Sequence, residues 1–374
     1  MTETSLAPAT LSRSRSLLEL AWLRLRRNKA AMVSLFVFAA IVIFSVLGPF
    51  FSPHGYDQVY GSYVKVPPSL SPYPKHATLE EAMKRAASQA RLQVQSFETS
   101  GTQFTATLTS SRAIDPRATR YVDRIDEFRN TKVTETRDDG RTVVMQGDIN
   151  GQYFLLGTDG NGRDLMTRIM IGGQVSLLVG LLASLVSLVI GVTYGAVSGY
   201  IGGRTDNLMM RFVEILYSLP FMFFVILLVA SFGRDFWLIF VAIGAIEWLD
   251  MARIVRGQTL SLKRRDFISA AHALGLSEGA VIRRHIIPNT LSPVLVFLTV
   301  RIPRIILLES FLSFLGLGVQ APLTSWGALI KEGADSMEAA PYLLICPAIF
   351  LVTTLFCLNF IGDGLRDAFD PKDR

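Results

Sequence analysis

The stretch that decides the fold is LLVGLLASLVSLVI, residues 177–190, which carries no charged side chain. It lies inside an uncharged run from about Gln174 to Gly199. An α-helix needs about 20 apolar residues to cross the hydrocarbon layer of a bilayer, so this run is long enough. Its apolar residues are continuous instead of recurring on one helical face. The run therefore predicts a membrane-spanning helix and not an amphipathic helix of a soluble domain.

Further apolar runs of this kind predict an all-α polytopic membrane protein with about six transmembrane helices. Besides residues 174–199, the runs are 31–51, 207–232, 236–249, 290–315 and 341–361. Charged residues make up 18% of the chain, below the roughly 25% of soluble domains, which agrees with this class. The first run is longer than a signal-peptide core and no small-x-small cleavage site follows it, so we expect an uncleaved anchor.

The distribution of lysine and arginine predicts the orientation of these helices. Residues 1–30 hold six basic residues and residues 251–288 hold seven, whereas the two short loops of the opposite side hold only Arg234 and Lys331. By the positive-inside rule, both termini are cytoplasmic in a multi-pass protein of the inner membrane. The net charge of +6 does not indicate nucleic-acid binding, because the basic residues cluster at the ends of apolar runs.

Residues 52–165 are too long for a simple connection and predict a small α+β domain on the outer side. Residues 79–90 have helix-forming composition, residues 92–97 and 104–108 alternate as strands do, and Asp138-Asp-Gly140 marks a turn before residues 142–145. The alternative is an ordered but irregular loop. The permease core would then comprise residues 166–374, with a cytoplasmic loop at 251–289.

Residues 14–28, within the cytoplasmic N-terminus 1–30, are apolar on one face and basic on the other. Such a segment predicts a helix that lies in the membrane interface before the first span. The alternative is an ordinary extension next to the membrane.

The inner loop contains RRDFISAAHALGLSEGAVIRRHIIPN, residues 264–289, which predicts two short helices with a break between them. We expect Asp266 to cap the first helix, Gly275 to end it, and the second to run up to Pro288. The small pair Ala270-Ala271 lets another surface approach the backbone closely, and a short helix with such a face can dock in a groove of a partner. The alternative is a basic loop that only sets topology.

The spacing of Ala270, Ala271, Gly275 and Pro288 resembles the EAA loop of importer-type ABC permeases, whose pattern is Glu-Ala-Ala, three residues, Gly, nine residues, Ile-x-Leu-Pro. Ser269 stands where the family usually has Glu, so it offers no carboxylate for a salt bridge to an ATPase. His285 stands where the family often has Ile. The ending HIIPN, residues 285–289, matches the ending usual in the peptide-permease branch.

The resemblance extends from about residue 157 to the end and includes the first span; it is closest to the C-type permease subunit of oligopeptide or dipeptide ABC importers. The segments that carry it are LGTDGNGRD (156–164), GYIGGRTD (199–206), WLDMARIVRG (248–257), ESFLSFLGLG (309–318), SWG (325–327) and GDGLRDAFDP (362–371). It says nothing of the role of residues 59–151, which are longer than we expect in this family.

The resemblance implies the type I importer fold and a set of partners. These are a second permease subunit in a heterodimer, two cytoplasmic ATPase subunits, an extracytoplasmic peptide-binding protein and the lipid bilayer. ATP and Mg would be bound by the ATPase subunits, with no cofactor on this chain. The residues implied in ATPase coupling are Asp266, Ser269, Ala270, Ala271, Gly275, His285 and Pro288.

Four charged residues fall inside predicted spans, where charge is costly and indicates function. They are Glu214, Arg301, Arg304 and Glu309. One reading is that they line a hydrated peptide pathway. The other is that they form ion pairs within or between helices.

No catalytic or metal-binding motif is present in the sequence, so we expect a transport component and not an enzyme. The Gly-x₄-Gly-Lys-Ser/Thr phosphate loop is missing, and no His/Cys cluster has the spacing of metal ligands. Residues 157–162 are glycine-rich and predict a turn near the outer membrane face. Cys346 and Cys357 lie in the last apolar run as small apolar residues.

Two other classes of function remain as alternatives. A secondary transporter would show an internal repeat between its halves, which is not seen here, and an ion-coupling carboxylate. A membrane sensor would need a cytoplasmic signalling domain, whereas the longest inner stretch is about forty residues.

Overall fold

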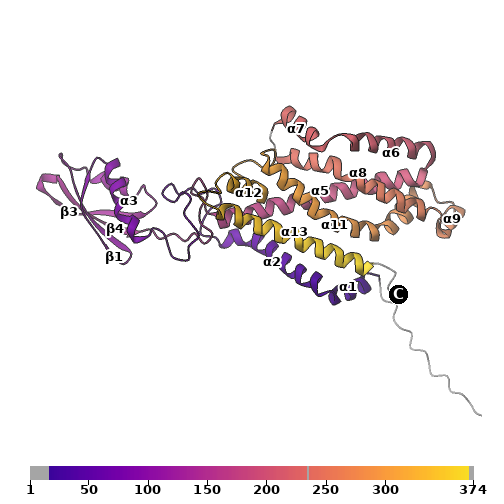
Figure 1. Ribbon diagram of the computed structural model, residues 1–374, viewed down its shortest axis with the longest axis horizontal. Coiled ribbons are helices and arrows are strands. Elements are labelled where there is room, and N and C mark those ends of the chain that lie inside the picture. Colours follow the sequence, from indigo (N-terminus) through magenta and orange to yellow (C-terminus); the bar gives the residue numbers. More distant parts are fainter. Residues whose placement is uncertain (1–16, 234–235, 370–374) are drawn as a thin grey trace, which may run out of the picture. The chain divides into compact units, whose positions relative to one another are not determined.

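The computed structural model describes residues 17–233 and 236–369, and these residues are mostly helical (Figure 1). Three basic residues that entered the topology argument lie outside the described residues, namely Arg13 and Arg15 of the segment 1–30, and Arg234. The chain divides into two compact units. The first comprises residues 1–41, 177–309 and 352–374, and the second comprises residues 42–176 and 310–351.

Four helical runs among the described residues are long and apolar enough to cross a membrane. They are α2 (Lys29–Phe51), α5 (Leu165–Ile201), the run Glu278–Phe314, most of which is α11 (Ile287–Phe314), and α13 (Tyr342–Phe369). A fifth span is obtained if α6 (Gly203–Ser218) and α7 (Phe221–Phe232) count together, although they are bent by 80°. Pro220 accounts for that bend, because a proline disfavours helical backbone in the residue before it, and Leu219 is extended.

The predicted fourth span, 236–249, is the first half of a longer helix, α8 (Phe236–Leu262). Glu247, Asp250 and Arg253 interrupt its apolar stretch, which is why its composition alone does not qualify it as a span. The helix continues through Leu262. The first part of the predicted cytoplasmic loop, residues 251–262, is therefore helical, and the non-helical connection starts only after α8. That the segment 251–289 is cytoplasmic stays a prediction.

Helices α5 and α8 of the first unit pack with their backbones close together. Gly191, Gly195 and Gly199 recur every four residues on α5 and face α8. A Cβ atom built on Gly195 would lie 2.3 Å from the carbonyl oxygen of Ala252, so only glycine fits there. Small residues at this spacing allow two helices to approach closely. This glycine pattern is visible in the sequence but was not among the predicted features.

Helix α1 (Leu17–Arg27) precedes α2 and belongs to the first unit. Its Leu25 is buried with Ala31 and Ala368, and Arg24 Nη1 donates to the carbonyl oxygen of Ala368 over 3.4 Å. The expected position of this helix in the membrane interface stays a prediction.

The second unit contains the predicted small α+β region (Figure 1). The helix is α3 (His76–Gln89), and the four strands form an antiparallel sheet in the order β1-β2-β4-β3. The strands are β1 (Gln93–Ser100), β2 (Gln103–Thr109), β3 (Phe128–Arg137) and β4 (Thr142–Ile149). The helix, β1, β2, the turn and β4 lie where the sequence predicted them, whereas β3 was missed.

The core of this α+β region lies between α3 and one face of the sheet. Leu79 and Met83 of α3 are buried against Phe104 of β2 and Met145 of β4. Short turns, η1 (Pro116–Ala118) and α4 (Thr119–Val122), join β2 to β3, and η2 (Asp138–Gly140) joins β3 to β4. The second unit also holds α12 (Trp326–Ala334), in which Ser325 Oγ accepts a hydrogen bond from the backbone nitrogen of Ala328 as the N-cap.

Candidate functional site

The predicted first helix of the inner loop is present as α9 (Asp266–Ala273). The N-cap is Arg265 and not Asp266 as predicted, because Arg265 is extended while Asp266 already has helical backbone. Asp266 therefore places its carboxylate in the first turn, where it meets the positive end of the helix dipole instead of bonding to a backbone N–H as a cap.

Gly275 ends α9, as the sequence predicted. Its φ of 76° lies in the left-handed region, which glycine adopts without the steric cost of a Cβ atom. Gly275 N donates to the carbonyl of His272 over 2.9 Å, and Leu276 N donates to the carbonyl of Ala271 over 3.2 Å. These two bonds form a Schellman motif, which satisfies the carbonyls at the end of the helix and fixes the exit direction of the chain.

The two faces of α9 have different surroundings. Ile268 and Ala271 are buried in a core with Val281, Ile286 and residues of α5 and α8. The opposite face is exposed and mostly apolar. Phe267 is 41% exposed and Leu274 is 80% exposed, and Ala270 and the polar Ser269 are exposed as well. The predicted small pair is thus divided, because Ala271 anchors the helix while Ala270 faces outward.

Polar contacts also hold α9 to the helices of the first unit. The Oη atom of Tyr200, in α5, lies 2.8 Å from Nε2 of His272, and the two rings stack at 15°. Lys263 Nζ donates to the carbonyl oxygen of Tyr200 and lies 5.3 Å from the centre of its ring. Through Tyr200, the end of α5 is joined to the segment that follows α8 and to α9.

The second predicted helix begins as α10 (Glu278–Val281) after Ser277, which occupies the N-cap position without a side-chain cap bond. It does not stop at Pro288. A π-helical turn, η3 (Ile282–Ile286), carries the chain directly into α11. Pro288 lacks an N–H and crowds the carbonyl four residues earlier, and the wider π turn relieves that conflict. His285 is half-buried and Pro288 is exposed.

An ion pair fixes the start of α6 to α8. Arg256 Nε and Nη2 donate to the two carboxylate oxygens of Asp206, each over 2.6 Å. Ser198 Oγ donates to the same carboxylate over 2.5 Å. A bidentate guanidinium–carboxylate pair of this kind is geometrically specific. It therefore constrains the position of α6 on α8 and also neutralises the carboxylate of Asp206.

The intramembrane charges fall into distinct environments. Arg301 of α11 pairs with two carboxylates of α8: Nη1 lies 3.3 Å from Glu247, and Nη2 pairs with Asp250. Arg304 is more exposed and lies 4.0 Å from Asp250. These contacts join α8 to α11. Both acidic partners fall within or next to the predicted fourth span but were not among the four predicted intramembrane charges.

The other two charged residues differ from this pair. Glu214 lies on α6, is exposed, and is 3.2 Å from Arg211 one turn earlier. Glu309 is fully buried near the end of α11. Which of the four charges line a pathway stays a prediction.

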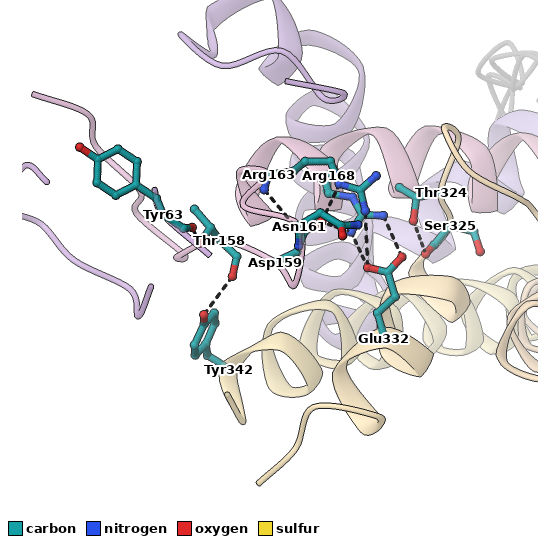
Figure 2. A network of polar contacts seen from close by, with 10 residues as sticks. All are labelled: Tyr63, Thr158, Asp159, Asn161, Arg163, Arg168, Thr324, Ser325, Glu332 and Tyr342. Atoms are coloured by element: carbon teal, nitrogen blue, oxygen red, sulfur yellow. Dashed lines mark hydrogen bonds and ion pairs between the residues drawn. The ribbon is translucent and has the colours of Figure 1, made fainter. Parts of the chain in front are cut away.

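A second polar cluster lies in the second unit, around the glycine-rich segment 157–162 (Figure 2). Asp159 Oδ2 accepts from Arg163 Nε over 2.8 Å and from Arg168 Nη1 over 2.5 Å. Arg168, which is buried in the first turn of α5, also pairs with Glu332 of α12, with Nη2 3.0 Å from Oε1. The segment read as a turn is therefore also the centre of a buried charge network.

Neighbouring contacts complete this cluster. The Oη atom of Tyr342 lies 2.9 Å from the carbonyl oxygen of Thr158 (Figure 2). It also lies 2.9 Å from the carbonyl oxygen of Val66. Asp164 caps α5, because its Oδ2 accepts from the backbone nitrogen and the hydroxyl of Thr167 over 2.8 and 2.6 Å. Burial raises the pKa of the Asp164 carboxyl above its usual value, against these two hydrogen bonds.

Two family models match the chain. One is described as binding-protein-dependent transport system inner membrane component and matches residues 191–374. The other is described as N-terminal TM domain of oligopeptide transport permease C and matches residues 16–75. The first match contains α6 to α11 and therefore the whole of α9 and its anchoring contacts.

Individual relatives agree with these matches. The oligopeptide transport system permease protein OppC of Haemophilus influenzae is 60% identical over 222 residues, which cover 59% of this chain and 71% of that protein. Its counterpart in Escherichia coli K12 is 63% identical over 225 residues, 60% of this chain and 74% of that protein. The dipeptide transport system permease protein DppC of Bacillus subtilis is 33% identical over 355 residues, 95% of this chain and 85% of that protein, so this match runs through the α+β region.

Proposed function

The chain belongs to the family of binding-protein-dependent transport system inner membrane components, and on this premise we propose that it is the permease subunit of an ABC importer that moves oligopeptides or dipeptides across the inner membrane. The substrate class is taken from the names of the relatives, which are peptide permeases.

The mechanism is based on one observation: helix α9 has one buried face and one exposed apolar face. Its buried face, with Ile268 and Ala271, ties it to α5, α8 and α11, while its exposed face presents Phe267, Ala270 and Leu274. An exposed apolar face on a short helix is suited to docking in a groove of a partner. We assign that groove to a cytoplasmic ATPase subunit, so that a change in the ATPase moves α9 and with it the helices to which α9 is anchored.

The assembly that follows has a second permease subunit, two ATPase subunits that bind ATP and Mg, and an extracytoplasmic protein that delivers peptide. Both termini and α9 lie on the cytoplasmic side, where the basic residues are concentrated. The α+β region lies on the opposite side. Since Ser269 has no carboxylate, docking of α9 rests on the apolar face and on neighbouring basic residues such as Arg265.

The test is ATP-dependent uptake of a radiolabelled peptide by the complete assembly reconstituted in vesicles, together with co-purification of the ATPase subunits. The double substitution Phe267→Ser and Leu274→Ser should abolish both, because it removes the exposed apolar face of α9. The matched control is Leu70→Ser in the second unit, where the leucine is 88% exposed. Uptake that survives without ATP and collapses with the proton gradient would contradict the proposal.

Gly275→Val offers a second test at the same helix. Valine cannot adopt a φ of 76° without strain, so the Schellman motif and the orientation of α9 should be lost. We expect the ATPase subunits to detach or ATP hydrolysis to continue without uptake. Normal association combined with normal uptake would show that α9 is not the coupling element.

A further inference from the structure

A pocket rich in arginine lies in the α+β region, and none of its lining residues belongs to the candidate functional site. It has a volume of about 550 Å³ and opens to solvent. Four of its lining residues are arginines, Arg91, Arg117, Arg120 and Arg124, and we call it the arginine pocket. The apolar side chains of Leu92 and Ile114 also line it, with Tyr121 beside them.

The positive charge of this pocket is not neutralised. Among the described residues, none of the four guanidinium groups forms an ion pair with a carboxylate. The pocket contains one carboxylate, Asp115, whose Oδ1 accepts a hydrogen bond from the backbone nitrogen of Arg117 over 2.8 Å. The lining therefore carries four positive charges and one negative charge.

Arg91 occupies a position at which its own backbone is strained. Helix α3 ends in a Schellman motif, with Arg91 N donating to Ser88 O over 3.0 Å and Leu92 N donating to Ala87 O over 2.8 Å. The residue at the turn of this motif is usually glycine, because its φ is positive. Here it is Arg91, with a φ of 58°. Glycine would adopt this conformation without the steric cost, whereas Arg91 adds an arginine to the lining of the pocket.

Arg120 and Arg124 add a second unfavourable arrangement. Arg120 lies in α4 and Arg124 lies two residues beyond its end at Val122, and both line the same pocket, where like charges repel each other. A bound anion would relieve this repulsion. Guanidinium groups bind carboxylates and phosphates through paired hydrogen bonds. The apolar side chains of Leu92 and Ile114 in the lining suit a ligand that also has apolar groups. The pocket is also much larger than a single inorganic anion requires.

We propose that the arginine pocket binds the free carboxylate of a short peptide whose apolar side chains rest on Leu92 and Ile114. The preference for an oxyanion follows from the four unpaired guanidinium groups. The choice of a peptide as its carrier rests on the proposed function. The α+β region would then be a peptide-contacting part of the permease, separate from the helices that cross the membrane.

The experiment uses the full chain in nanodiscs of neutral phosphatidylcholine. Binding of N-acetyl-leucyl-leucine is measured by microscale thermophoresis, beside the same compound with an amidated C-terminus and beside soluble short-chain phosphatidylglycerol. We expect the amide to bind at least about tenfold more weakly, because it cannot form charge-assisted hydrogen bonds. The double variant Arg120→Gln and Arg124→Gln should lose a similar factor, and Arg129→Gln, an exposed arginine of β3 outside the pocket, should not.

Arg91→Gly separates binding from folding. It removes a guanidinium and relieves the strained backbone, so peptide affinity should fall while the melting temperature stays equal or rises. Equal affinity for the acid and the amide, equal affinity of the pocket variants and the Arg129 control, or tighter binding of phosphatidylglycerol than of peptide would each overturn the proposal. An assembly that imports peptides while the isolated chain fails these tests would leave the proposed function standing. Peptide binding by a chain whose assembly imports no peptide would remove the proposed function only.

Discussion

The hydroxyl oxygen of Tyr200 lies 2.8 Å from Nε2 of His272, and this contact joins the end of α5 to α9. The contact adds to the packing of Ile268 and Ala271, which are buried against residues of α5, α8 and α11. A displacement of α9 is therefore transmitted to α5 directly, without passing through the connecting loop.

Replacing Tyr200 by phenylalanine should loosen α9 without unfolding the chain. The ring still stacks on His272, but a hydrogen bond of about 1 kcal/mol is lost, so backbone amides of α9 should exchange with deuterium about fivefold faster. Hydrogen–deuterium exchange with mass spectrometry measures this. The control is Tyr217→Phe, since the exposed Tyr217 ring instead lies 4.3 Å from the guanidinium carbon of Arg253. Equal exchange in α9 for both variants would show that the Tyr200 contact does not stabilise this helix.

Gly195→Ala should destabilise the packing of α5 on α8. The added Cβ atom would lie 2.3 Å from the carbonyl oxygen of Ala252, which is backbone and cannot turn away. Overpacking of this kind costs about 1–3 kcal/mol, so the melting temperature in detergent should fall. Gly257→Ala in α8 is the control, because a Cβ atom there meets no atom within 4 Å and alanine favours the helix. A melting temperature that is unchanged by Gly195→Ala would contradict the close approach.

Arg168→Met should be more damaging than Glu332→Gln. Arg168 is buried and shared by Asp159 and Glu332, so its removal leaves buried carboxylate charge poorly compensated, at a cost of about 3–5 kcal/mol. Glu332 is partly exposed, and glutamine still accepts a hydrogen bond from the guanidinium. Thermal unfolding of the two single variants and the double variant gives the coupling between these residues. If Glu332→Gln were as costly as Arg168→Met, the dominant role of Arg168 would be refuted.

The same substitution at two neighbouring alanines should have opposite consequences. Ala271→Leu overfills the core beneath α9 and should lower the melting temperature, at a cost of about 1–3 kcal/mol. Ala270→Leu lies on the exposed face and should leave the melting temperature within error while weakening co-purification of the ATPase. If Ala270→Leu binds the ATPase normally, the docking face must lie elsewhere.

Much of the fold could be read from the sequence where a pattern was strong. Continuous apolar runs located the long helices, and Gly275 located the end of α9, because these features depend on local chemistry. The end of α8 could not be placed in this way. The apolar run predicted there ends at residue 249, but α8 continues to Leu262, and the charged residues of this second part pair with other helices, Asp250 with Arg301 and Arg256 with Asp206.

The segment that forms the candidate site could be located from the sequence, but the burial of its individual side chains could not. The spacing of Ala270, Ala271 and Gly275 indicated a docking helix, but only the structure distinguishes the buried alanine from the exposed one. Glu247, which pairs with Arg301, and Glu332, which pairs with Arg168, lie 54 and 164 residues from those arginines in sequence, and no local pattern shows such pairs. Strand β3 was missed because its burial is irregular and its residues are mostly charged or polar.

The continuity of α8 has a mechanical consequence. Leu262, at its end beside α9, and Glu247, which pairs with Arg301, belong to one uninterrupted helix. At a rise of about 1.5 Å per residue they are roughly 22 Å apart, so α8 acts as a lever arm. A tilt of about 5° pivoting at the α9 end would move Glu247 by about 2 Å, a displacement sufficient to separate a carboxylate from its guanidinium. In the proposed assembly, docking of the ATPase at α9 can thus open or close the ion pair between Glu247 and Arg301 without any change within α8.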